Sequence, residues 1–109
     1  NKYVFMHSDG YITDIYKHLV EVGVDALNSQ LFCMNFEDLE QFKGQITFWG
    51  EIDRQQILPS DDPEDGREAV RKVMSRLGDP SGGVIAQFEF GLSANPEIVI
   101  AVLEEWDKL

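Results

Sequence analysis

The 109-residue sequence has one cysteine and no long apolar run. Because Cys33 is the only thiol, the chain cannot form an internal disulfide, and we interpret Cys33 as a small buried hydrophobic residue. No stretch approaches the roughly 20 apolar residues that a membrane-spanning helix requires. No segment combines a basic start with the apolar core of a signal peptide. We therefore predict a soluble, cytoplasmic protein with no membrane partner.

Positive charge is also scarce. Lys and Arg total 9 against 20 Asp and Glu, which gives a formal net charge of −11. A field of this sign repels phosphate backbones and anionic lipids, so we expect no nucleic-acid partner. A phosphate-binding loop is missing too, because "GDPSGG" has neither the required lysine nor a preceding strand. A nucleotide-binding or phosphate-responsive module on an open sheet is therefore the least favoured interpretation.

The apolar residues fall into two alternating patterns. Short β-branched and aromatic runs predict four strands, at residues 3–6, 24–28, 46–50 and 84–88. The run at 3–6 has no polar alternation, which predicts a strand covered on both faces. Apolar residues three and four positions apart predict a helix after each strand, starting near residues 11, 36, 63 and 96. Helix caps are expected at Asn35, Asp62 and Asn95.

Four strand-and-helix units in one domain, residues 1–109, are compatible with two α/β architectures. Roughly 20 residues or more separate successive strand starts, enough for right-handed parallel crossovers. One architecture is an open flavodoxin-like sheet with helices on both faces, and the other is half of a (β/α)8 TIM barrel. The helical patterns do not decide between them. In both, ligands bind at the carboxyl ends of the strands.

Polar residues gather at those strand ends. They are His7, Ser8 and Asp9, then Asn28, Ser29 and Gln30, then Glu51 and Asp53, and finally Gln87 and Glu89. Because side chains alternate along a strand, His7 and Asp9 can point to the same side, as can Gln87 and Glu89. Imidazole and carboxylate ligands suit zinc, iron or manganese. The pattern predicts a metal site at His7, Asp9 and Glu89.

Structural alternatives stay open for the same three residues. Ser8 or Asp9 is a favoured cap for a helix starting near Tyr11. His7 is equally compatible with a neutral core histidine bonded to a carbonyl group. Glu89 is either a buried carboxylate that needs a cation, a metal or a proton, or an ordinary surface glutamate.

Taken in order, the strand-end motifs resemble the C-terminal part of the uroporphyrinogen decarboxylase superfamily. The matching segments are "YVFMHSDG", "GVDALNSQ", "ITFWGEIDRQQILP" with "DPEDGREAV", and "GGVIAQFEFG" with "NPEIVIAVLEEW". The resemblance covers essentially the whole chain and implies roughly the last four units of a (β/α)8 barrel. A complete barrel takes ~250 residues. We therefore expect a C-terminal half-barrel fragment.

The resemblance implies two chemistries, the tetrapyrrole decarboxylation of porphyrin biosynthesis and zinc-dependent methyl transfer between corrinoid proteins and thiols. The late-strand histidine of the decarboxylase is replaced here by Glu89. In the methyltransferases a His-x-Cys motif and a late cysteine hold zinc, and the matching positions are His7, Asp9 and Glu89. Oxygen ligands at two of these positions imply zinc or a harder transition metal. Asp53 matches an aspartate of the family, whereas Glu51 replaces a glycine.

Two functions are therefore expected. The first is an enzyme module, a lyase or metal-assisted methyltransferase when full-length, with a tetrapyrrole or corrinoid substrate or partner and a divalent metal. Its pocket would be lined by Asn28, Gln30 and Asp53, and we expect this chain alone to be inactive. The second is a non-catalytic half barrel that self-associates, because two open sheet edges favour a homodimer that completes a barrel-like assembly.

Overall fold

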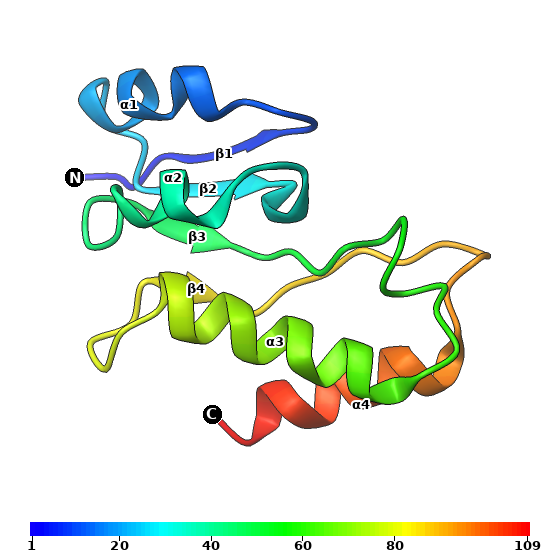
Figure 1. The fold of residues 1–109 in the computed structure, drawn as a ribbon. Coiled ribbons are helices and arrows are strands. Elements are labelled where there is room, and N and C mark those ends of the chain that lie inside the picture. The colour runs from blue at the N-terminus through cyan, green and yellow to red at the C-terminus, as the bar shows by residue number, and fades with distance from the viewer.

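The computed structural model describes all 109 residues and confirms the four predicted strand-and-helix units (Figure 1). In chain order the elements are β1 (Phe5–Ser8), α1 (Thr13–Glu21), β2 (Ala26–Ser29), the 3-10 helix η1 (Leu31–Cys33), α2 (Phe36–Glu40), β3 (Thr47–Trp49), α3 (Pro63–Leu77), β4 (Val84–Ile85) and α4 (Pro96–Asp107). The longest helix, α3, has 15 residues. None of the helices has the length and apolar character needed to cross a membrane.

The strands form one all-parallel sheet in the order β1-β2-β3-β4. In its register His7 lies opposite Asn28, Asn28 opposite Trp49, and Trp49 opposite Ile85. The polar residues that follow the strands therefore lie together at the carboxyl end of the sheet. A flavodoxin-like sheet contains a reversal of strand order, and this order has none.

The core lies on one face of the sheet. Met6, Leu27, Phe48 and Val84 are aligned by the strand register, and they belong to the main apolar cluster or pack against it. All four helices contribute buried residues to the same cluster, including Tyr16, Leu39, Val70 and Ile98. Right-handed crossovers that always advance in one direction place successive helices on the same face, which explains this arrangement.

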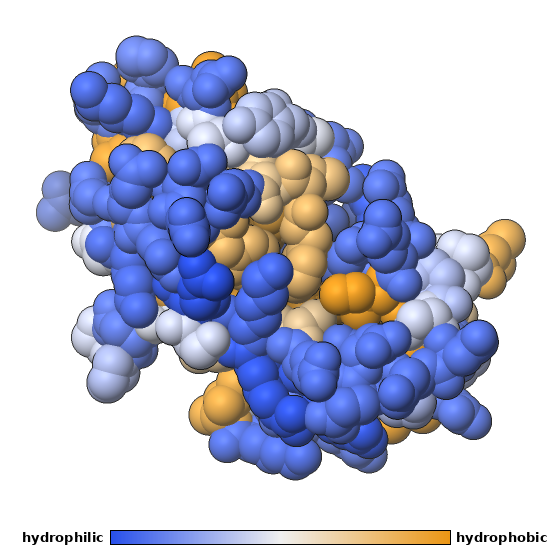
Figure 2. All heavy atoms as spheres, viewed as in Figure 1, coloured by the Kyte–Doolittle hydropathy of each residue, from blue (hydrophilic) through white to orange (hydrophobic).

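The opposite face of the sheet is open at β1. Phe5 is 58% exposed and meets the half-buried Trp49 edge to face, with ring centroids 5.3 Å apart. The prediction that the first strand is covered on both faces is wrong, because the helices contribute to the cluster on the other side. Elsewhere hydrophilic side chains dominate the view in Figure 2, with an apolar area between the upper and lower parts.

The predicted caps are confirmed for three helices. The side chains of Asn35, Asp62 and Asn95 each accept a hydrogen bond from the backbone N–H two residues later. Helix α1 begins at Thr13 without any side-chain cap, so the capping alternative for Ser8 and Asp9 is wrong. The predicted burial of Cys33 is also wrong. Leu31 is the residue of η1 that turns into the core.

Candidate functional site

A hydrogen-bonded network at the strand ends holds His7 in one orientation. The Asn28 amide nitrogen donates to the Trp49 carbonyl oxygen at 2.7 Å and to Gln87 Oε1 at 2.9 Å. Asn28 Oδ1 lies 2.6 Å from His7 Nδ1. Because both amide hydrogens of Asn28 are used, its oxygen must accept a hydrogen from Nδ1 of His7. In the neutral ring, Nε2 is then the nitrogen that can accept a proton.

Gly50 makes this network possible, because it lets two segments of backbone come close together. A Cβ at this position would lie 2.5 Å from the Gln87 carbonyl oxygen, and the backbone φ of +60° also favours glycine. Gly50 therefore lets the end of β3 approach the segment that follows β4. This contact brings Gln87 within reach of Asn28.

The three predicted metal ligands lie in one cluster, in which His7 is next to Asp9 and Arg54 links Asp9 to Glu89. His7 Nε2 lies 3.4 Å from Asp9 Oδ1, and Arg54 Nη2 lies 3.4 Å from the same oxygen. Arg54 Nη1 lies 2.9 Å from Glu89 Oε2. Glu89 is 63% exposed at its side chain, so it is a surface glutamate that pairs with a cation.

Arg54 competes with a metal ion for two of the three predicted ligands. Asp9 and Glu89 both pair with the guanidinium of Arg54, so a cation already lies between two of the three predicted ligands. No group of three His, Cys, Asp or Glu side chains is placed to hold a metal. The metal site at His7, Asp9 and Glu89 stays a prediction.

Glu51 adds a buried acid to the same region. It is 4% exposed. Burial raises the pKa of its carboxyl group, and the positive charge of Arg54 opposes this shift while Glu89 and Asp9 reinforce it. The site therefore combines three carboxyl groups with one guanidinium.

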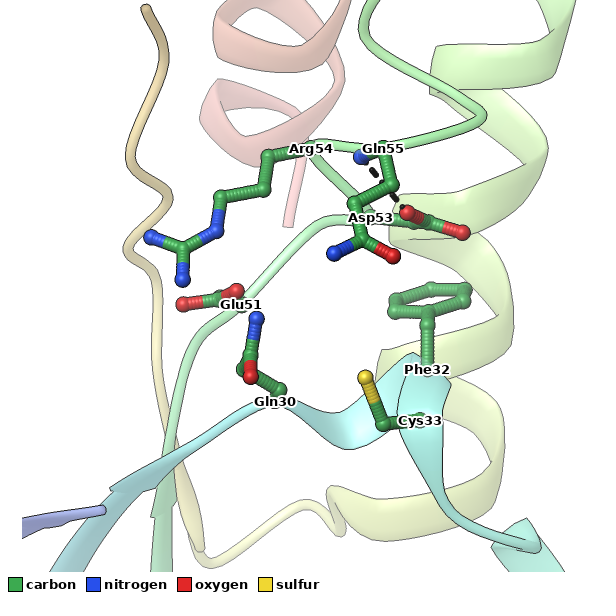
Figure 3. Close-up of a pocket in the computed structure, with 7 residues that line it drawn as sticks. All are labelled: Gln30, Phe32, Cys33, Glu51, Asp53, Arg54 and Gln55. Atoms are coloured by element: carbon green, nitrogen blue, oxygen red, sulfur yellow. Dashed lines mark hydrogen bonds between the residues drawn. The ribbon is translucent and has the colours of Figure 1, made fainter. Parts of the chain in front are cut away.

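The predicted substrate residues divide between two places. Gln30 and Asp53 line a small pocket together with Glu51, Arg54 and neighbouring side chains (Figure 3). Asn28 belongs to the histidine network instead. Asp53 Oδ1 also accepts hydrogen bonds from the backbone N–H groups of Gln55 and Gln56, at 2.8 and 3.1 Å. These bonds shape the loop after β3.

Arg54 belongs to the candidate site, and the sequence patterns did not predict it. Its partners Asp9 and Glu89 lie 45 and 35 residues away along the chain. A signal existed nonetheless, because Arg54 is the one cation of "EIDRQQ", directly after a strand and among acidic strand ends. Neither protein-family models nor curated proteins give a match to this chain. The fold and site define an α/β protein with a parallel four-stranded sheet and a polar, acidic cluster at its strand ends.

Proposed function

We propose that this chain is the C-terminal half of a (β/α)8-barrel enzyme of the uroporphyrinogen decarboxylase type, and that the strand-end cluster is part of its active site. The strand order β1-β2-β3-β4 supports this, because neighbours in sequence are neighbours in such a barrel. The helical contribution to one face of the sheet supports it as well. Active sites of these barrels lie at the carboxyl ends of the strands.

Among the chemistries of that superfamily, we propose methyl transfer to a thiol or hydroxyl acceptor. The carboxyl groups of Asp9, Glu51 and Glu89 face a single guanidinium, that of Arg54, in a chain of net charge −11. This field opposes the binding of a tetrapyrrole that carries many carboxylates. A methyl donor and a neutral acceptor are not repelled, and a corrinoid is the donor that the sequence resemblance suggests.

His7 is the proton acceptor in this proposal. Nε2 takes the proton of the acceptor S–H or O–H, and Asp9, 3.4 Å away, stabilises the imidazolium that forms. The sulfur or oxygen then attacks the methyl carbon. The bond between methyl and donor breaks, and its electron pair stays with the donor. The single observation that carries the proposal is the 2.6 Å contact with Asn28, which leaves Nε2 unprotonated in the neutral ring.

Methyl transfer is tested on the full-length barrel that contains this chain, with methylcobalamin and a small thiol, and the thioether product is measured by mass spectrometry. We expect the His7→Gln variant to slow product formation by about 100-fold or more. The matched control is His18→Gln, because His18 is the other histidine and lies exposed on α1. Equal rates in wild type and His7→Gln would contradict the role of His7. Release of CO2 from uroporphyrinogen III would contradict the choice of methyl transfer.

A second candidate function, self-association without catalysis, is favoured by the open sheet face. Phe5 and Trp49 meet on this face, and β1 and β4 are the two unpaired edges of the sheet. Two copies related by a two-fold axis would pair β4 of each copy with β1 of the other. This pairing would enclose the open sheet face of both copies. Absence of methyl transfer from a stable dimer favours this candidate.

Light scattering tests self-association with two substitutions to lysine. We expect Phe5→Lys to give monomers, because it places a charge on the face that the second copy would cover. Val22→Lys is the control, since Val22 is 77% exposed and follows α1, away from the open face. A wild-type monomer at micromolar concentration would overturn the candidate, as would a dimer that survives Phe5→Lys.

A further inference from the structure

Glu51 is a buried acid that lacks a partner. Its exposed fraction is 4%, and neither a hydrogen bond nor an ion pair within 4.0 Å involves its carboxylate. Glu105 is buried to a similar degree, yet Arg71 and Lys108 contact its oxygens at 2.9 and 3.0 Å. Burying an unpaired ionised carboxylate is strongly unfavourable. The contrast marks Glu51 as a group whose partner comes from outside the chain.

The Glu51 carboxylate faces a pocket in which three neighbouring side chains already have partners. Figure 3 shows it directed toward the guanidinium of Arg54 and the amide of Gln30. Arg54 pairs with two carboxylates outside the pocket, and Asp53 accepts from the loop backbone. Gln30 Oε1 accepts from the Gly10 backbone N–H at 2.5 Å. Among the acceptors that line the pocket, Glu51 is therefore the buried one without a hydrogen bond or an ion pair.

The charges around the pocket select the kind of ligand. Asp9, Glu51 and Glu89 outnumber the single guanidinium of Arg54, so a further anion is repelled and a cation is attracted. An N–H donor that carries positive charge makes the strongest hydrogen bond to a carboxylate. The ring of Phe32 also lines the pocket and offers an apolar surface to an alkyl group.

We infer that this pocket binds a small organic ammonium ion, with its N–H groups donating to the carboxylate of Glu51. The ammonium group supplies the positive charge and the donors that the buried carboxylate lacks. Because the pocket has room for about one water-sized group, the ammonium head enters it and the alkyl part stays at its open side. This inference does not depend on methyl transfer, because it concerns binding to the chain as it stands.

The inference is tested by nuclear magnetic resonance titration of the 15N-labelled chain with ethylammonium chloride at constant ionic strength. We expect saturable shifts of the amide resonances of Gln30, Cys33 and Arg54, which surround the pocket. The variant Glu51→Gln keeps the shape of the side chain and removes its charge, and we expect it to bind at least about tenfold more weakly. The control Glu104→Gln, at an exposed acid of α4, should bind like the wild type.

Acetamide and sodium acetate, titrated in the same way, identify the chemistry that the pocket recognises. Neither should produce the saturable shifts, because acetamide has no positive charge and acetate is an anion. Equal binding of acetamide would overturn the ammonium class, and equal binding of acetate would overturn the charge argument. Unchanged ethylammonium affinity in a folded Glu51→Gln protein would overturn the role of Glu51. Shifts that never saturate would overturn the site itself.

Discussion

Removing the side chain of Asn28 tests whether its hydrogen bonds hold the carboxyl ends of the strands together. The Asn28→Ala variant loses three hydrogen bonds, to His7 at 2.6 Å, to the Trp49 carbonyl at 2.7 Å and to Gln87 at 2.9 Å. A typical internal hydrogen bond contributes about 1 kcal/mol net. Asn28 is half-buried, so water replaces part of the loss. We expect the free energy of unfolding to fall by about 2–3 kcal/mol.

Urea unfolding of the wild type and two Asn→Ala variants measures this loss. The control is Asn35→Ala, which removes one exposed cap bond at α2 and should cost about 1 kcal/mol. The 15N chemical shifts of His7 provide a second readout, because Nδ1 should carry the proton in the wild type and share it with Nε2 in Asn28→Ala. A loss no larger than that of the control, or an unchanged His7 tautomer, would refute the network.

Three further substitutions test the core, the strand contact and the cation. Burial raises the pKa of Tyr16 to about 12 from 10.0. The folded state therefore keeps the full contribution of the neutral Tyr16 side chain to its stability below pH 10, and loses it between pH 10 and 12 as the unfolded chain ionises first. Over that range the free energy of unfolding, measured with urea, should fall by about 3 kcal/mol more in the wild type than in Tyr16→Phe. The same pH dependence in both proteins would contradict the burial of Tyr16. Gly50→Ala should lower the stability measured by thermal unfolding by about 2 kcal/mol or more, because the new Cβ meets the Gln87 carbonyl. Gly44→Ala has open space around its Cβ and should cost less. Equal losses in the two variants would contradict the close approach at Gly50. Arg54→Gln should increase zinc affinity in calorimetric titration, because it frees Asp9 and Glu89, two of the three predicted ligands. Equal zinc binding by the wild type would show that the guanidinium does not block them.

The elements of the fold were predictable because their signals are local. Cap residues such as Asn35, Asp62 and Asn95 act within two residues of their own position, and all three behave as predicted. Strand order and the covered face depend on contacts between distant segments, which no local pattern encodes. This is why the sequence left two architectures open and predicted burial on both sides of residues 3–6.

The candidate site was predictable as a location and only partly as chemistry. The alternation of side chains brought His7 and Asp9 to one side, and the parallel strands brought Glu89 to the same edge, as the shared ion-pair cluster confirms. The cation between them comes from a loop, and no strand periodicity predicts a loop side chain. Glu51 was noted as a replacement for glycine, without any signal of its burial.

The loop after β3 changes how the acidic strand ends should be understood. Glu51 places a buried carboxyl group beside Asp9 and Glu89, which raises the cost of keeping all three ionised. Arg54, three residues later, offsets part of that cost by pairing with Asp9 and Glu89, but it makes no ion pair with Glu51. One short segment thus supplies both an extra anion and the cation that neutralises its neighbours. When all three carboxyl groups are ionised, two negative charges remain, and Glu51 carries one of them inside the pocket. An ammonium ligand and a metal ligand are therefore distinguishable, because the first should depend on Glu51 and the second should emerge when Arg54 is removed.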